Sequence, residues 1–124
     1  MSNRMRTALL SAAVLAAACV CGAADKVETV KGYVLDSACA FTKNLDKPIS
    51  AECATKCAKN GSPLVILADG GAIYWPIDDQ TPSSGQNAKL LPYAGKRVTV
   101  TGKTYERGGS HAMVISKIEA LDGK

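Results

Sequence analysis

Histidine and aromatic side chains are scarce in this sequence. The 124 residues include one histidine, His111, and aromatic residues make up 5% of the chain. A Ser/His/Asp or Cys/His catalytic arrangement needs a histidine beside its nucleophile, and haem attachment needs a Cys-x2-Cys-His motif. His111 lies far along the chain from every cysteine and fits neither pattern. We therefore expect a non-catalytic protein.

The chain also lacks a concentration of basic residues. Two of its 15 Lys and Arg residues, Arg4 and Arg6, lie close to the N-terminus, and the others are scattered along a stretch that holds all 11 Asp and Glu residues. That stretch is close to neutral. Because electrostatic capture of nucleic acid relies on a clustered basic surface, we expect no nucleic-acid partner.

Long apolar runs are absent after residue 24, and the run before it has the form of an export signal. Arg4 and Arg6 precede "ALLSAAVLAAACVC", and the small residues "GAA" before Asp25 suit cleavage. The run is short for a transmembrane helix. We expect a signal peptide at residues 1–24, a domain at residues 25–124, and a periplasmic or secreted protein with no membrane span. Two alternatives are a lipoprotein anchor at Cys19, which follows "LAAA", and an uncleaved anchor.

The residues after the signal, about 100 in number, are enough for one small domain with one core. Five stretches have the alternation or the β-branched content of strands. They lie at residues 27–35, 64–69 and 72–77, around Val98 and Val100 before the turn at 108–109, and from His111 to about Leu121. Glycine pairs at 70–71 and 108–109 indicate turns between consecutive strands, and Gly32 indicates a bend or bulge in the first.

Two helical segments separate these strands. In "PISAECATKCAKNG" Ser50 is a suitable N-cap, and Asn60 and Gly61 supply a stop, which predicts a short helix. In "AKLLPYAG" a helical turn is broken by Pro92. The resulting order, with a helix-bearing insert after the first strand and a short helix between the third and fourth, is that of the OB-fold. We expect a mainly β protein built as a small five-stranded Greek-key barrel; an open sheet capped by helices is the alternative.

Three stretches, "GYVLDSAC", "CATKCAKNGSPLVIL" and "YAGKRVTVTGK", together resemble a family of short secreted bacterial proteins known only as a domain of unknown function. The resemblance covers nearly all of the chain after the signal. It implies an OB-like barrel and export, and it implies no activity. Members often carry a histidine just before the second cysteine, and this sequence has Ser50 and Glu52 in that region, so no Cys/His metal site is inherited.

Three cysteines follow the predicted signal: Cys39, Cys53 and Cys57. On one helix Cys53 and Cys57 would have Cβ atoms about 5–6 Å apart, too far for a disulfide, which needs about 3.5–4.5 Å. We expect a disulfide from Cys39 to one of the other two, and the sequence leaves the choice open. Closing a loop of about 15 residues stabilises a domain by about 3 kcal/mol in the chain-entropy model. The third thiol would be buried as a small hydrophobic side chain.

Two alternatives use the same cysteines. Three thiolates suit Cu(I) or Zn(II), so a metal-binding protein with Cys39, Cys53 and Cys57 as ligands is the second hypothesis, although the spacing matches no zinc finger. Without that site we expect no cofactor. A thiol redox protein is the third hypothesis, since Cys53 lies near a helix N-terminus, yet Cys-x3-Cys differs from the Cys-x2-Cys of thioredoxin-like enzymes.

OB barrels bind ligands across their second and third strands and the adjoining loops. If Ile73, Trp75 and Ile77 share the core face, Tyr74 lies outside, where Tyr33 and Tyr105 could join it. Such an aromatic face would stack on a glycan, a peptide or a small ligand. The simpler interpretation is that Trp75 belongs to the core and the tyrosines are ordinary barrel surface. In either case we expect an exported, non-catalytic binding or envelope-associated module.

Overall fold

A computed structural model describes residues 26–43 and 50–121 of the chain. The predicted signal peptide at 1–24 and the alternative anchor at Cys19 lie outside the described residues. The elements in chain order are β1 (Lys26–Asp36), α1 (Ser37–Thr42), α2 (Ala51–Lys59), β2 (Leu64–Ala68), β3 (Ile73–Pro76), α3 (Asn87–Leu90), the short 3-10 helix η1 (Leu91–Tyr93), β4 (Arg97–Arg107) and β5 (Ser110–Ala120). Within the described ranges no helix has the length and apolar character needed to cross a membrane.

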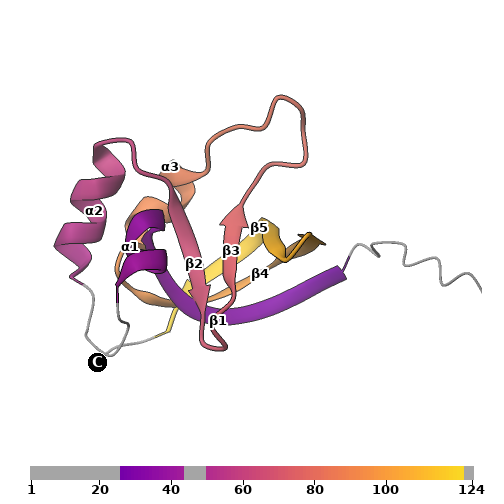
Figure 1. The fold of residues 1–124 in the computed structure, drawn as a ribbon, viewed down its shortest axis with the longest axis horizontal. Helices are drawn as coiled ribbons and strands as arrows, with labels where there is room; N and C mark the ends of the chain where they lie inside the picture. The colour runs from indigo at the N-terminus through magenta and orange to yellow at the C-terminus, as the bar shows by residue number, and fades with distance from the viewer. Residues whose placement is uncertain (1–25, 44–49, 122–124) are drawn as a thin grey trace, which may run out of the picture.

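The strands form a closed barrel in the order β1-β2-β3-β5-β4, with β4 returning to pair with β1 (Figure 1). Every strand pair is antiparallel except β3 with β5, which run parallel. The mainly β, five-stranded barrel with helices after the first and third strands is therefore confirmed. The open-sheet alternative is wrong, because β1 and β4 pair along residues 26–33 and 97–104 and close the barrel.

Two glycines let the long strands β1 and β4 bend around the barrel. β1 pairs with β4 through its first half and with β2 through its second half, so it must curve strongly. A Cβ at Gly32 would collide with the carbonyl of Leu67, and one at Gly102 would collide with the carbonyl of Val114. These positions therefore require the close backbone approach that only glycine allows. The bend predicted at Gly32 lies where the partner of β1 changes.

The sheet has apolar side chains on both faces. Inside the barrel a core gathers around Val34, Ile66 and Met113. A second cluster lies outside it, where Leu35 and its neighbours Val65 and Leu67 pack beneath Ala40 of α1, with Ile73 against them. Because β2 contributes to both clusters, "LVIL" is buried throughout and shows no alternation.

Both helices of the insert begin at a capping side chain. The Ser50 hydroxyl accepts the backbone N–H of Cys53 at 3.2 Å, and α2 ends at Lys59, with Asn60 as its C-cap and Gly61 next at a φ of 96°. This confirms the predicted helix and its ends. The sequence reasoning missed α1, which Asp36 caps by accepting the N–H of Cys39 at 3.0 Å.

The predicted orientation of β3 is wrong. Tyr74 packs against the barrel core, while Ile73 packs outside, under α1. Trp75 is 36% exposed and its ring lies 6.5 Å from that of Phe41 on α1. The reason is the second apolar cluster: α1 gives the outer face of β3 apolar partners, so the aliphatic and indole side chains do not mark the inner face.

Candidate functional site

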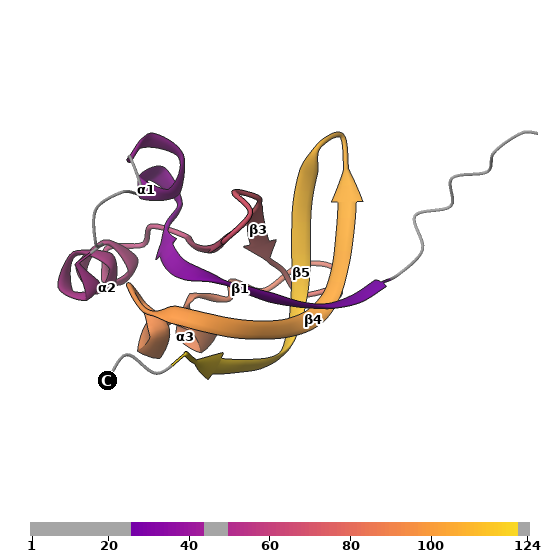
Figure 2. The ribbon, with the colours of Figure 1, turned by 90° about the horizontal axis from the view of Figure 1, so that it is seen from below.

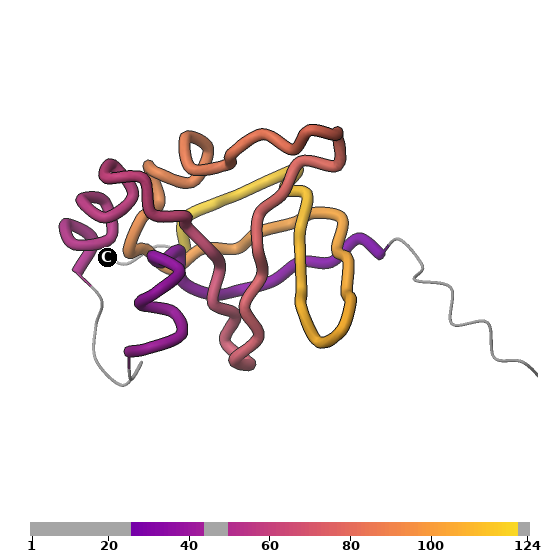
Figure 3. The backbone as a smooth tube through the Cα atoms, turned by 45° about the horizontal axis from the view of Figure 1, so that its top comes forward, coloured from indigo at the N-terminus to yellow at the C-terminus, as the bar shows by residue number. Residues whose placement is uncertain are grey.

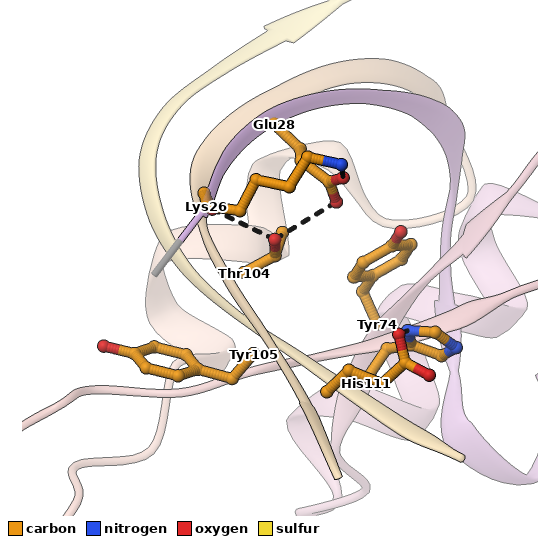
Figure 4. A pocket seen from close by; sticks show the side chains of 7 residues that line it. Lys26, Glu28, Tyr74, Thr104, Tyr105 and His111 are labelled. Carbon is orange, nitrogen blue, oxygen red and sulfur yellow. Dashed lines mark hydrogen bonds and ion pairs between the residues drawn. The ribbon is translucent and has the colours of Figure 1, made fainter. Parts of the chain in front are cut away.

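A pocket of about 250 Å³ opens at the end of the barrel where β1 begins and the β4–β5 hairpin turns (Figure 4). It is lined by Lys26, Glu28, Tyr74, Thr104, Tyr105, Glu106 and His111. These residues come from four strands whose pairing fixes their positions: Lys26 lies opposite Thr104, and His111 lies opposite both Tyr74 and Glu106. The pocket is therefore a product of barrel closure.

One wall of the pocket is a connected set of polar groups around Glu28. Its carboxylate pairs with the Lys26 ammonium at 2.7 Å and accepts the Thr104 hydroxyl at 3.1 Å. These hydrogen bonds, from Lys26 first and Thr104 second, lower the pKa of Glu28, so it is ionised at neutral pH. The Lys26 side chain is 72% exposed, and a salt bridge in such a position is weak and open to exchange.

The opposite wall holds two rings and a second carboxylate. The rings of Tyr74 and His111 lie 5.3 Å apart at 45°, and the Glu106 carboxylate lies 3.9 Å from Nδ1 of His111. Partial burial, followed by the charges of Glu28 and Glu106, raises the pKa of Tyr74. The phenol therefore stays protonated and can donate a hydrogen bond to a ligand.

The three tyrosines proposed as a ligand face do not form one surface. Tyr74 lies in the pocket, whereas Tyr33 shares the outer face of β1 with Leu35. Tyr105 lines the rim, but Figure 4 shows its ring turned away from that of Tyr74, and the Lys103 ammonium lies 5.3 Å from its centroid. The aromatic platform expected from the sequence is therefore reduced to Tyr74 and its ring partner.

Sequence reasoning missed the charged part of the pocket. Glu28 and Thr104 occupy inward positions of β1 and β4, in phase with the buried Val34 and Val100. A carboxylate and a hydroxyl on the core side of two strands were the signal that could have identified the site, since a polar group facing inward needs a partner or a cavity.

The cysteines lie at the other end of β1, on the two helices of the insert. Figure 2 shows α1 and α2 at one end of the molecule and the β4–β5 hairpin at the other, and the tube in Figure 3 shows the same arrangement. Cys39 and Cys57 are partly buried and Cys53 is exposed, and no disulfide joins these three described cysteines. Cys39 and Cys57 both interact electrostatically with Cys53. The fold thus brings all three predicted cysteines together.

The surroundings of these thiols favour their protonated form. Burial raises the pKa of Cys39, and the Asp36 carboxylate and the other two cysteines add to this effect. Burial, then Cys53, raises the pKa of Cys57. Because the thiolate is the reactive species, these two thiols are poor nucleophiles at neutral pH. This counts against the redox hypothesis for Cys39 and Cys57.

Asp36 fixes the position of Cys39. Asp36 is 4% exposed, and its carboxyl group accepts the N–H of Cys39 through one oxygen and the hydroxyl of Ser62 through the other. Burial acts to raise the pKa of Asp36, but hydrogen bonds from Ser62 and from the start of α1 outweigh it and the net pKa is lowered. The residue is therefore a buried carboxylate that ties α1 to the start of β2.

Among the residues that the structure describes, no group of three or more His, Cys, Asp or Glu side chains is arranged to hold a metal ion. Comparisons of the chain with models of known protein families, with curated proteins and with solved structures gave no match.

Proposed function

We propose that this protein is an exported, non-catalytic binding module whose ligand occupies the pocket at the open end of the barrel. The observation that carries the proposal is the convergence of polar and aromatic side chains from four strands on one cavity of about 250 Å³. Binding sites are typically concave, with a few fixed polar groups among apolar walls. Export follows from the signal peptide predicted at residues 1–24.

The size of the pocket limits the ligand. Cavities that accept drug-sized molecules span about 300–1,000 Å³, and this pocket lies just below that range. A small molecule, or the end of a glycan or peptide, fits it better than an extended chain. The polar walls around Glu28 and the ring of Tyr74 would set the orientation of such a ligand.

A library screen with variants at two tyrosines tests this function. Purified domain is screened by thermal shift against small saccharides, amino acids, amines and short peptides. Tyr74→Ala should abolish the shift produced by a true ligand, while Tyr33→Ala, on the outer face, should preserve it. Tyr74→Phe, which keeps the ring, controls for loss of packing against the core. A ligand whose shift survives Tyr74→Ala, or a screen with no ligand at all, contradicts the proposal.

The proposed module is also stabilised by a disulfide from Cys39 to Cys53 or Cys57. Support comes from the placement of Cys39 on α1 and of Cys53 and Cys57 on α2, and from their mutual electrostatic interactions. α2 contains both Cys53 and Cys57, so a bridge within that helix would distort it. The bridge would fasten the outer helix α1 to α2.

Alkylation without reductant tests the disulfide. Protein recovered from the periplasm is alkylated, and its mass is measured. One reactive thiol indicates the disulfide, and Cys39→Ser should then leave no bridge, whereas three reactive thiols would refute it. Metal analysis of the same sample decides the metal hypothesis: near-stoichiometric copper or zinc that is lost in Cys39→Ser would replace the disulfide with a thiolate site.

A further inference from the structure

The pocket carries an unequal charge. Among the described residues that line it, Glu28 and Glu106 are acidic, while Lys26 is the one side chain with a permanent positive charge. That ammonium is engaged with Glu28 at 2.7 Å. Glu106 has His111 as its neighbour at 3.9 Å, a distance too long for a hydrogen bond. An incoming ligand therefore meets one carboxylate without a strong partner and a second whose partner is exposed.

The aromatic wall of the pocket also favours a cationic ligand. A cation within about 6 Å of a ring centroid is attracted to the face of the ring. Tyr74 lines the pocket together with both carboxylates, and its ring lies 5.3 Å from that of His111, the neighbour of Glu106. A positive group in this pocket would thus share one cavity with an aromatic ring and two carboxylates.

We propose that the ligand of this pocket carries an ammonium or guanidinium group on a short stem. This inference rests on the proposed function of the same site. An anion would have to bind against two carboxylates with Lys26 as its one cationic partner, and a neutral polyol would gain nothing from the excess negative charge. The same chemistry is offered by a free small amine and by a lysine side chain of a peptide.

Substitution of Lys26 should change the affinity of the pocket in opposite directions for cations and for anions. Its ammonium occupies the place beside Glu28 that a ligand cation would take, so it competes with a cation and would assist an anion. Lys26→Gln should raise the affinity for a cation about two- to fivefold, the range expected for an exposed ion pair. Lys31→Gln is the matched control, because Lys31 is an exposed residue of the same strand that does not line the pocket.

Three probes of equal length separate the possibilities. Butylamine, butanol and butyrate are titrated into isotopically labelled protein, and the amide resonances of Tyr74, Thr104 and His111 are followed. Butylamine should shift them with an affinity on the order of 1 mM for so small a fragment, and binding should weaken as salt is added. Glu106→Gln should lower its affinity about two- to fivefold, while Glu119→Gln, outside the pocket, should not.

The outcomes distinguish the two proposals. If butyrate or butanol binds in the pocket as tightly as butylamine, or if Lys26→Gln weakens butylamine, the cation inference is overturned while the binding function stands. If no probe shifts the pocket resonances and the library screen also finds no pocket ligand, both fall. Nα-acetyl-lysine methylamide, in a fourth titration, identifies the source: tighter binding than butylamine indicates a peptide lysine, and equal or weaker binding indicates a free amine.

Discussion

Asp36→Ala should be among the most destabilising single changes in this domain. The carboxylate is nearly fully buried, caps α1 through the N–H of Cys39 and accepts the hydroxyl of Ser62. Loss of an N-cap costs about 1 kcal/mol, and loss of a hydrogen bond to a charged group costs about 1.5–3 kcal/mol. We therefore expect the free energy of unfolding to fall by about 2.5–4 kcal/mol.

Urea denaturation followed by circular dichroism measures the loss, because the unfolding free energy falls linearly with denaturant. Two further variants separate the contribution of the Asp36 charge from that of the Ser62 hydrogen bond. Asp36→Asn keeps an oxygen that can cap α1 but removes the charge, and Ser62→Ala removes one donor. Each should cost less than Asp36→Ala. Asp36 and Ser62 share a hydrogen bond, so the losses of unfolding free energy in Asp36→Ala and Ser62→Ala should not add when the two substitutions are combined.

Because the pKa of Asp36 is lowered in the folded protein, its contribution to the unfolding free energy depends on pH. A carboxyl group whose folded pKa lies below its unfolded value of about 3.9 contributes stability that is present above that value. The contribution is lost as the pH falls through the folded pKa. The wild-type protein should therefore lose stability more steeply below about pH 4 than Asp36→Asn does.

Two results would refute this reasoning. A loss below about 0.5 kcal/mol for Asp36→Ala would place the residue in the range of ordinary surface substitutions, and its hydrogen bonds would then contribute little. Equal acid sensitivity of the wild type and Asp36→Asn would show that another carboxylate controls acid unfolding.

Three further predictions concern the barrel and α2, each measured as a change in unfolding free energy. Gly102→Ala should destabilise by about 1–3 kcal/mol, because the new Cβ meets the backbone of Val114, while Gly70→Ala, with no atom within 4 Å, should be nearly neutral; equal effects would contradict the close approach. Ser50→Ala should cost about 1 kcal/mol through loss of the α2 cap, and an unchanged midpoint would remove that role. Met113→Ala should cost about 2–5 kcal/mol, since Met113 is 0% exposed in the core; a smaller loss would mean that the core closes around the cavity.

The barrel was predictable because local signals mark its boundaries. Glycine pairs end the hairpins at residues 70–71 and 108–109, and alternation in β4 places Val98 and Val100 inward. Ser50 and Asn60 mark the ends of α2. These are short-range features, and the order of five strands and two helical segments that they give matches that of the OB-fold.

The faces of β3 and the helix α1 were not predictable in the same way. α1 is six residues long and begins at an aspartate that closes a strand, so no helical periodicity reveals it. Since α1 covers Leu35 and Ile73 from outside, apolar residues on β3 no longer identify the inner face. Tyr74 points inward because the barrel end is open there, which only closure of the sheet determines. The pocket was missed for the same reason.

The length of β1 separates the two sites of the molecule. Lys26 and Glu28 contribute to the pocket, and Asp36 at the other end of the same strand positions Cys39. At about 3.3 Å per residue the ten steps from Lys26 to Asp36 amount to about 33 Å along the strand. Because β1 curves, the direct separation is shorter than this contour length, but the insert helices and the β4–β5 hairpin lie at opposite ends of the molecule (Figure 2). Charges separated by more than the Debye length of about 10 Å are largely screened at ordinary ionic strength. The oxidation state of the cysteines should therefore alter the stability of the domain without altering pocket affinity, and a change in affinity on reduction would show that the strand couples the two ends.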